Sequence, residues 1–307
     1  MNIFHAAAEV KPNGKKVCVA IGFFDGVHLG HQQILRQAIA DAHQHDSLPL
    51  VLTFDRHPNV VVAPDKAPPL IYSLPQKLRA IQSLGVENIF LIHFDQKFSV
   101  QTGEEFIRGL VRDLGKIHSI CVGAEFVFGH KRGGNVVLLK KLGAELDFLV
   151  HGLSAVSLDG QAVSSTRIRE TIRTGNLDDA SQMLGRPYAI SGKVVIGDKL
   201  GRQLGFPTAN LDAAGLILPP NGVYAAVTRV TGRLYRVALN IGLRPTVAAG
   251  RPQLRVEAHL LEFAGDLYGQ ELEIEIGDKL RDEKKFASVD ELRRQILLDV
   301  AAVKKQF

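Results

Sequence analysis

The chain has 307 residues, of which 46% are hydrophobic and 22% are charged, as is usual for a globular protein of two domains. Its net charge of +5 comes without a dense Lys/Arg tract and without Trp, which disfavours a general nucleic-acid surface. Two cysteines are too few for a disulfide framework, and no signal peptide or membrane-length apolar run is present, so we expect a cytoplasmic protein without a membrane segment.

The first part of the chain alternates short apolar runs with helical patterns. Strands are predicted at 17–22, 49–54, 88–93, 119–123 and 145–151, and helices at 28–43, 75–84 and 102–113. Thr102 and Glu105 have the spacing of a capping box at the start of the last of these helices. Cys18 and Cys121 fall in or beside apolar runs and are predicted to be buried strand thiols. This alternation predicts a Rossmann-like α/β domain, with a parallel sheet and helices on both faces.

From residue 191 onward, apolar residues recur with a period of two. The predicted inward positions are Val223, Ala225, Val227, Val237, Leu239, Ile241, Leu254, Val256, Ala258, Leu260, Leu272, Ile274 and Ile276. This pattern predicts an antiparallel sheet or small barrel, followed by an amphipathic helix at 288–303 with Leu292, Ile296, Leu297 and Val300 on its apolar face. The two patterns meet near Gly185, so we predict domains at 1–185 and 186–307.

A glycine- and histidine-rich motif, residues 22–31, follows the first predicted strand and opens the first helix. A helix N-terminus presents free N–H groups and a positive dipole end, which attract phosphate. His28 and His31 share one face of the first turn, where both rings can reach the same phosphate. Such a pair can also bind a metal or cap a loop, but the strand and the glycines favour phosphate. The candidate residues are Gly22, Phe24, Asp25, His28, Gly30 and His31.

A second candidate anion site is formed by Ser164, Ser165, Thr166 and Arg167, at the start of a helical pattern. The three hydroxyl groups donate hydrogen bonds, and the guanidinium group can bind phosphate oxygens in pairs. A simple N-cap followed by a surface arginine is the alternative interpretation.

These two motifs resemble those of the nucleotidyltransferase superfamily. His28-Leu29-Gly30-His31 is similar to its HxGH motif, and Ser165-Thr166-Arg167 to its later SSTxxR-type motif. The resemblance implies in-line attack on the α-phosphate of ATP, with the histidines on the triphosphate and the Ser/Thr/Arg cluster on the departing pyrophosphate.

Further segments resemble the FAD synthetase branch of that superfamily, namely 24–28, 53–54 with 57–58, and 122–123 with 126–129. The resemblance implies that FMN is adenylylated to FAD, with His57, Glu125 and Phe128 in loops that bind flavin or nucleotide. Glu125 stands where that branch often has Asn or Asp, and Asp55-Arg56 where Glu-Pro is more usual.

A glycine-rich segment at 197–210 is the densest motif of the second domain. Its glycines permit a backbone that wraps phosphates, although the spacing is not that of a Walker A loop, and a simple turn is the alternative. Thr208 and Asn210 offer neutral oxygens suited to Mg²⁺ that is already balanced by ATP phosphates. The candidate ATP-binding residues are Gly197, Lys199, Gly201, Gly205, Pro207 and Thr208.

Glu257 lies in the middle of a predicted strand. Alternation places it on the polar face with Arg255 and His259, where periodicity alone favours a solvent-facing side chain. The functional alternative is a general base that takes the proton from an attacking hydroxyl group.

Segments 205–210, 222–224, 240–242 and 256–259 resemble the riboflavin kinase family in that family's order. The resemblance extends over residues 187–307 and implies a Greek-key barrel with a terminal helix. It also implies that Thr208 and Asn210 hold Mg²⁺-ATP and that Glu257 activates the 5′-hydroxyl of riboflavin. Together, the two halves resemble the bifunctional bacterial riboflavin kinase/FAD synthetase family, which makes FMN and then FAD from riboflavin and ATP.

Three alternatives remain open at this point. The first is a riboflavin kinase with a degenerate adenylyltransferase domain. The second is a flavin- or RNA-binding regulator on the same scaffold, and the third a nucleotidyltransferase for another phosphorylated vitamin. Self-association is allowed by the sequence but not required by it.

Overall fold

The computed structural model describes residues 1–198, 200–244 and 253–306. These residues form two compact units, one of Met1–Leu70 with Leu74–Ser165, the other of Ile71–Ser73 with the chain from Thr166 onward. This division falls before the predicted domain boundary at 185/186, because helices α7 (Ser165–Thr174, from its second residue) and α8 (Leu177–Leu184) group with the second unit. The boundary between functional domains stays a prediction. No helix in the described part of the chain is long and apolar enough to cross a membrane.

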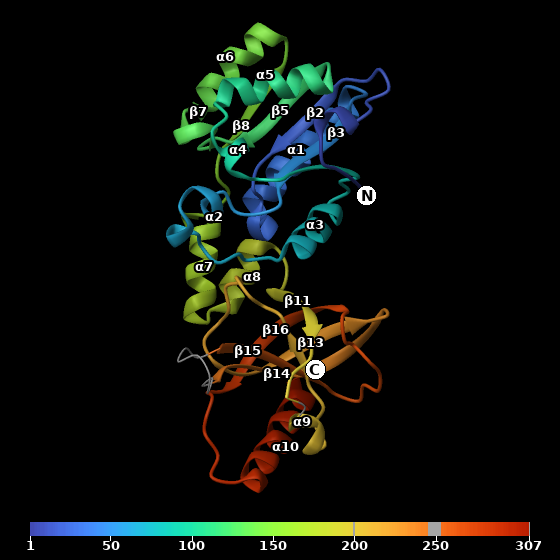
Figure 1. Ribbon diagram of the computed structural model, residues 1–307, viewed down its shortest axis with the longest axis vertical. Helices are drawn as coiled ribbons and strands as arrows, with labels where there is room; N and C mark the ends of the chain where they lie inside the picture. Colours follow the sequence, from blue (N-terminus) through green and yellow to red (C-terminus); the bar gives the residue numbers. More distant parts are fainter. Residues whose placement is uncertain (199, 245–252, 307) are drawn as a thin grey trace. The chain divides into compact units, whose positions relative to one another are not determined.

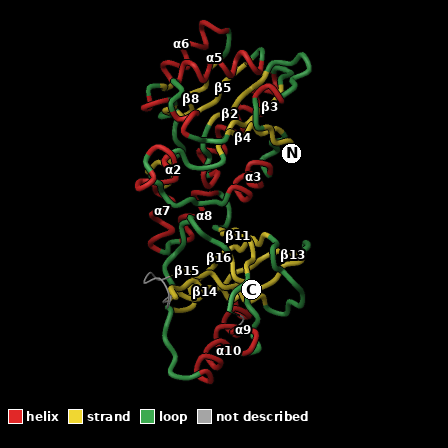
Figure 2. The backbone as a smooth tube through the Cα atoms, viewed as in Figure 1, coloured by secondary structure: helices red, strands yellow, loops and turns green. Residues whose placement is uncertain are grey.

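The first unit is an α/β structure built on a parallel sheet with strand order β1-β4-β3-β2-β5-β8 (Figures 1 and 2). Its sheet strands are β1 (Asn2–Phe4), β2 (Val17–Ile21), β3 (Leu48–Phe54), β4 (Asn88–Ile92), β5 (Ile117–Gly123) and β8 (Leu149–Leu153). Its helices are α1 (Leu29–Gln44), α2 (Asn59–Val62), α3 (Leu74–Gln82), α4 (Gln96–Ser99), α5 (Gly103–Leu114) and α6 (Val136–Leu146). Two short ribbons pair β6 (Val127–Phe128) with β7 (Gly134–Asn135) and β9 (Ser157–Leu158) with β10 (Gln161–Ala162). The parallel sheet is confirmed.

The local predictions in this unit have mixed outcomes. The capping box is confirmed, since Thr102 Oγ1 accepts from Glu105 N–H and Glu105 Oε2 accepts from Thr102 N–H at 2.9 Å. The strand predicted at 145–151 is wrong at its start, because α6 continues to Leu146 and β8 begins at Leu149. Asp147 has φ 59°, a left-handed conformation that ends α6 at this point.

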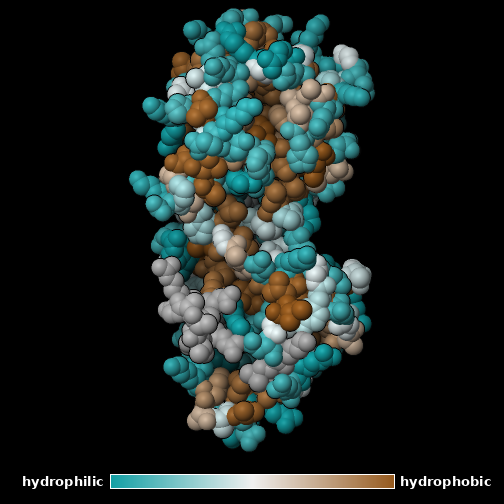
Figure 3. All heavy atoms as spheres, viewed as in Figure 1, coloured by the Kyte–Doolittle hydropathy of each residue, from teal (hydrophilic) through white to brown (hydrophobic). Residues whose placement is uncertain are grey.

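The sheet is covered on both faces, and the alternation within β2 shows how. Val19 and Ile21 pack in one hydrophobic cluster with residues of α5 and α6, whereas Ala20 packs in a second cluster with residues of α1 and α3. Cys18 and Cys121 are fully buried, as predicted, and burial raises the pKa of both thiols. Hydrophilic side chains predominate on the visible surface around α5 and α6 (Figure 3), as amphipathic helices require.

The strand order reverses at β2. Strands β3 and β4 lie on one side of it, whereas β5 and β8 lie on the other. In parallel α/β sheets, ligands bind beyond the carboxyl ends of the strands at such a switch point. Gly22 follows β2 directly and Gly123 ends β5, so the first motif stands at the place where this fold binds ligands.

The second unit contains a closed antiparallel barrel of strand order β11-β12-β15-β14-β13-β16, which confirms the predicted barrel (Figures 1 and 2). Its strands are β11 (Ala189–Val195), β12 (Ala209–Leu211), β13 (Gly222–Val230), β14 (Arg233–Arg244), β15 (Gln253–Leu260) and β16 (Glu271–Arg281). The short α9 (Leu200–Gln203) precedes β12, and the predicted terminal helix is α10 (Val289–Gln306). Gly185, with φ 70°, caps α8 just before the barrel begins.

The inward face predicted for β13 is wrong. Tyr224 and Ala226 face inward, because they pair with Leu239 and Val237 on the buried face of β14. Ala225, predicted inward, packs outside the barrel with Val303 of α10. The outer face of β13 is therefore also buried, and a strand buried on both faces shows no informative alternation.

Two further side chains lie outside the predicted core. Leu254 is 44% exposed and Leu297 is 53% exposed, so neither belongs to an apolar stripe. A polar residue of α10, Asp299, contacts the barrel instead: its buried carboxylate binds Arg281 of β16 at 2.7 Å. Asp299 and Val303 are thus the buried residues of α10, whereas Leu297 is exposed to solvent.

Candidate functional site

The two histidines of the first motif lie together at the start of α1. His28 is the N-cap, and its Nδ1 accepts a hydrogen bond from the backbone N–H of His31 at 3.4 Å. The two rings stack with 3.6 Å between their centroids. A Cβ atom on Gly30 would lie 3.3 Å from Cε1 of His28, so a larger residue there would press on this ring. The geometry therefore presents both imidazoles at a helix N-terminus, where a phosphate is attracted.

The segment before the helix, residues 22–28 and hereafter the histidine loop, has an unusual backbone. Phe24 has φ 55° and Val27 has φ 42°, although residues with a side chain, and β-branched ones above all, avoid this region. Phe24 and Asp25 are nevertheless almost completely buried, and Gly22 leaves room for the Phe24 ring, since a Cβ at that position would lie 2.7 Å from its Cε1. The surrounding structure must hold the loop in this shape.

Hydrogen bonds from three separate segments hold the loop. The carbonyl of Phe23 accepts from Lys77 Nζ at 3.2 Å and from Thr53 Oγ1 at 3.1 Å. The carbonyl of Asp25 accepts from Ser165 Oγ at 3.2 Å. The loop is thus attached to β3, to α3 and to the beginning of α7.

The second motif is divided between the two units. Ser164 precedes α7 and Ser165 is its first residue, and both belong to the first unit. The structure brings Ser165 to the histidine loop through Asp25. Thr166 and Arg167 belong to the second unit, and their action on the triphosphate stays a prediction.

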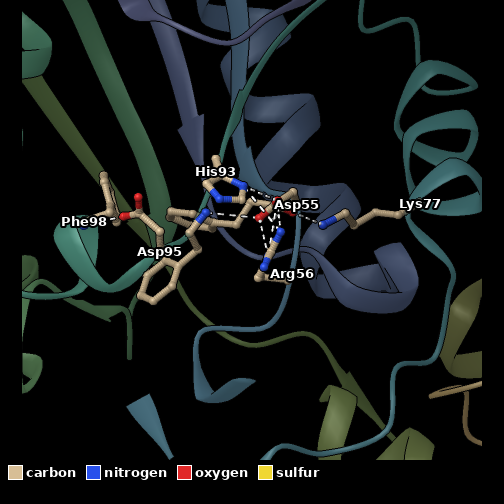
Figure 4. Close-up of polar contacts among 8 residues, drawn as sticks. Asp55, Arg56, Lys77, His93, Asp95 and Phe98 are labelled. Atoms are coloured by element: carbon tan, nitrogen blue, oxygen red, sulfur yellow. Dashed lines mark hydrogen bonds and ion pairs between the residues drawn. The ribbon is translucent and has the colours of Figure 1, made fainter. Parts of the chain in front are cut away.

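Asp55, which directly follows β3, is the centre of a polar cluster (Figure 4). Its carboxylate contacts His93 Nδ1 at 2.7 Å and Arg56 Nη2 at 3.0 Å, and it accepts from the Phe94 N–H at 3.0 Å. Burial acts to raise the pKa of Asp55, but the hydrogen bonds from Arg56, Phe94 and His93 outweigh it and lower that pKa. Asp55 is therefore a fixed carboxylate beside the end of β3, and Arg56 is its ion-pair partner.

The predicted flavin or nucleotide residues have different surroundings. The His57 ring meets the Phe23 ring edge-on at 5.0 Å, which brings it to the histidine loop. Phe128 stacks on Phe126 at 5.2 Å and packs with the hydrophobic core, an arrangement that favours a structural role. Glu125 is exposed.

In the second unit, a row of side chains crosses four strands on the outer face of the barrel. Asn210 pairs with Glu257, Glu257 with Asn240, and Asn240 with Val223. These four residues line a cavity of about 540 Å³. Its other lining residues include Thr208, Phe286, Leu292 and Ile296. Glu257 therefore lines a partly open cavity with both polar and apolar lining residues, as ligand sites often have.

The glycines of the 197–210 motif pack against the predicted metal-binding side chains. A Cβ atom on Gly197 would overlap the amide group of Asn210, and one on Gly201 would lie 3.3 Å from Thr208 Oγ1. Gly205 has φ 88°, which a residue with a side chain rarely adopts. The carbonyl of Pro207 lies 2.8 Å from Nδ1 of His259, while Lys199 lies outside the described residues.

The carboxylate of Glu257 remains accessible from the cavity. Arg255 Nη1 binds Asp198 at 2.6 Å and lies 3.5 Å from Glu257 Oε1, so the guanidinium is committed mainly to Asp198. Thr208, Asn210 and Glu257 supply hard oxygen donors, and the described residues contain no cluster of three or more His, Cys, Asp or Glu side chains that could hold a metal. This donor set fits Mg²⁺ that keeps phosphate and water ligands.

Sequence reasoning missed Lys77 of α3, whose side chain is buried at the histidine loop. Lys77 shares a face with Leu74, Leu78 and Ile81, which pack in the hydrophobic cluster beneath α1. A lysine on the apolar face of a helix was the available signal, because a buried ammonium group requires partners.

Comparison with known proteins assigns a family to each half of the chain. A family model described as FAD synthetase matches residues 10–167, and one described as riboflavin kinase matches residues 184–307. A curated relative from Escherichia coli (strain K12) is 40% identical over 294 residues, which cover 94% of this chain and 93% of the relative. A relative from Pseudomonas fluorescens is 37% identical over 305 residues, covering 99% and 97%. Both are named bifunctional riboflavin kinase/FMN adenylyltransferase.

One solved structure has the same fold over nearly its whole length. It is described as a macrolide-efflux protein from Streptococcus pneumoniae, with a TM-score of 0.82, 29% sequence identity, and coverage of 99% of this chain and 98% of that one. Its description differs from the family models, both of which match segments that contain the sites described above.

Proposed function

This chain belongs to the family of bifunctional riboflavin kinase/FMN adenylyltransferases, and we propose that each of its two sites performs one of the two reactions. The outer cavity of the barrel is the kinase site, and the histidine loop with the start of α1 is the adenylyltransferase site. The single observation that carries this assignment is that each family's matched segment contains one site.

In the kinase site, Glu257 is the general base. It takes the proton from the 5′-hydroxyl of riboflavin, whose oxygen then bonds to the γ-phosphorus of ATP as ADP leaves. Its cross-strand neighbours Asn210 and Asn240 line the same cavity. Thr208 and Asn210 hold Mg²⁺, which when bound neutralises charge on the ATP phosphates. The apolar wall with Phe286 and Leu292 receives the flavin ring.

In the adenylyltransferase site, a phosphate oxygen of FMN attacks the α-phosphorus of ATP, and pyrophosphate leaves to give FAD. His28, His31 and the α1 N-terminus stabilise the negative charge that develops on the phosphates. Ser165 orders the loop through Asp25, while Thr166 and Arg167 bind the departing pyrophosphate. Because attack is direct, no covalent enzyme intermediate is needed.

The test is to incubate the purified protein with riboflavin, ATP and Mg²⁺ and to separate riboflavin, FMN and FAD over time. The wild type forms FMN and then FAD. Glu257→Gln lowers FMN formation by roughly 10²- to 10⁴-fold, as removal of a general base does, but still converts added FMN to FAD. His28→Ala has the reverse effect. If Glu257→Gln phosphorylates riboflavin at the wild-type rate, Glu257 is not the general base. If the wild type forms FMN but no FAD, the adenylyltransferase half of the chain is degenerate.

A further inference from the structure

The side chain of Lys77 reaches from α3 to the end of β3, beside Asp55 (Figure 4). The residue is only 3% exposed. Its ammonium group donates to Phe54 O at 2.7 Å, to Phe23 O at 3.2 Å and to Thr53 Oγ1 at 3.4 Å. A buried lysine with three acceptors around it is specifically placed, since burial of an unpartnered charge is strongly unfavourable.

The contacts account for all three ammonium protons. Thr53 Oγ1 donates its own proton to Phe23 O, so the hydroxyl oxygen accepts the proton from Lys77. Two carbonyls and one hydroxyl thus match the three N–H donors of the charged form, whereas a neutral amine has two. The Phe23 ring adds a cation–π contact, with its centroid 4.4 Å from Nζ.

One of these acceptors belongs to the histidine loop. Phe23 O immediately precedes Phe24, the first residue of the loop with a left-handed backbone, and the other two acceptors belong to β3. Lys77 therefore joins the start of the strained segment to a rigid strand. On the far side of the segment, Ser165 holds Asp25 O.

We propose, on the basis of the proposed adenylyltransferase site, that Lys77 is a positioning residue: its ammonium group holds the histidine loop in the conformation that presents His28 and His31 to the ATP phosphates. Lys77 acts through Phe23 O and not by touching substrate. Misplacement of catalytic groups by about 1 Å costs on the order of 100-fold in rate, so the expected effect is on turnover.

The test uses full-length Lys77→Met, which keeps the stem but removes charge and donors, and Lys77→Gln, which keeps two N–H donors without charge. Lys141→Met on the exposed face of α6 is the matched control. FAD formation from FMN, riboflavin phosphorylation and thermal unfolding are measured on each preparation. We expect Lys77→Met to lower kcat for FAD formation about 100-fold, with KM for ATP changed less than about threefold and the kinase unchanged. Lys77→Gln should lose less of the kcat for FAD formation than Lys77→Met, and Lys141→Met should keep the wild-type kcat.

A folded Lys77→Met that forms FAD at the wild-type rate overturns the inference, and so does a folded Lys77→Met that loses both activities in parallel, because Lys77 would then not act on the histidine loop alone. If Lys77→Met does not fold, Lys77→Gln takes its place, and a folded Lys77→Gln that forms FAD at the wild-type rate overturns the inference. His28→Ala, measured alongside, distinguishes a failure of the proposed adenylyltransferase site from a failure of the proposed role of Lys77. FAD formation retained by His28→Ala refutes the proposed site; FAD formation lost in His28→Ala but retained in Lys77→Met refutes the role of Lys77 alone.

Discussion

Ser165 Oγ donates a hydrogen bond of 3.2 Å to the backbone carbonyl of Asp25, which lies 140 residues earlier in the chain. Two motifs that are far apart in the sequence are thereby connected, the glycine- and histidine-rich loop after β2 and the hydroxyl cluster at the start of α7. The accepting carbonyl lies in the middle of the histidine loop, between Phe24 and Val27, which both have positive φ. A side chain that was predicted to bind phosphate therefore also orders the opposite motif.

Ser165→Ala removes this hydrogen bond and is expected to lower FAD formation about five- to tenfold, because one hydrogen bond contributes about 1 kcal/mol. Riboflavin phosphorylation should not change. The matched control is Ser83→Ala, which also removes a hydroxyl that donates to a backbone carbonyl, but at an exposed position. Steady-state rates of the two reactions provide the measurement, and equal rates of FAD formation in Ser165→Ala and wild type would refute the ordering role.

The pH dependence of FAD formation should report on Lys77. Burial lowers the pKa of Lys77 from 10.5 to about 8, against the opposing effect of the Asp25 and Asp55 carboxylates that face it. We expect kcat for FAD formation to fall as the pH rises through about 8, since deprotonation removes one of three donors and the charge.

The lowered pKa of Lys77 should make its contribution to stability rise with pH, whereas kcat for FAD formation should fall. Between pH 8 and 10.5 the unfolded chain binds the Lys77 proton more tightly than the folded chain does, so the contribution of Lys77 to the free energy of unfolding rises with pH. A fall in activity over this range is therefore not explained by loss of the Lys77 contribution to folding. Urea unfolding of wild type and Lys77→Met at pH 7 and pH 9 measures that contribution. We expect the free energy of unfolding of the wild type, minus that of Lys77→Met, to be larger at pH 9 than at pH 7. A smaller difference at pH 9 would contradict this expectation.

The ion pair between Arg281 and Asp299 should stabilise the second unit. Arg281 Nε and Nη2 lie 2.9 and 2.7 Å from the two oxygens of the buried Asp299 carboxylate, which attaches α10 to β16. Arg281→Met leaves this carboxylate without its charged partner and is expected to lower the free energy of unfolding by about 3 kcal/mol. Arg173→Met is the control, because its pair with Glu170 is exposed and contributes little. Similar unfolding midpoints for the two variants would contradict the assignment.

The sequence predicted those structural features correctly that one local physical cause determines. The capping box at Thr102 needs only local backbone groups, and the continuous apolar run of β2 needs only burial on both faces. The histidine pair could be placed because spacing on a helix determines which side chains meet.

Structural features that depend on tertiary contacts could not be predicted from the sequence. The face of β13 depends on α10, which covers the strand from outside and removes the contrast between apolar and polar positions. The partners of Lys77 come from β3 and from the histidine loop, which local patterns do not bring together. In each case the deciding contact joins elements distant in the chain.

The close packing of Gly197 against Asn210 gives a last prediction. Gly197→Ala would place a methyl group on the Asn210 amide, which must then shift from its position in the wall of the cavity. We expect riboflavin phosphorylation to fall at least tenfold, with the larger part of the loss in KM for Mg²⁺-ATP, because Asn210 is a proposed Mg²⁺ ligand. FAD formation from added FMN should be unchanged. Gly109→Ala in α5, where a Cβ meets Arg112 Nη2 at an ordinary 3.9 Å, is the control. Wild-type kinase kinetics in Gly197→Ala would show that Asn210 does not hold the metal in this position.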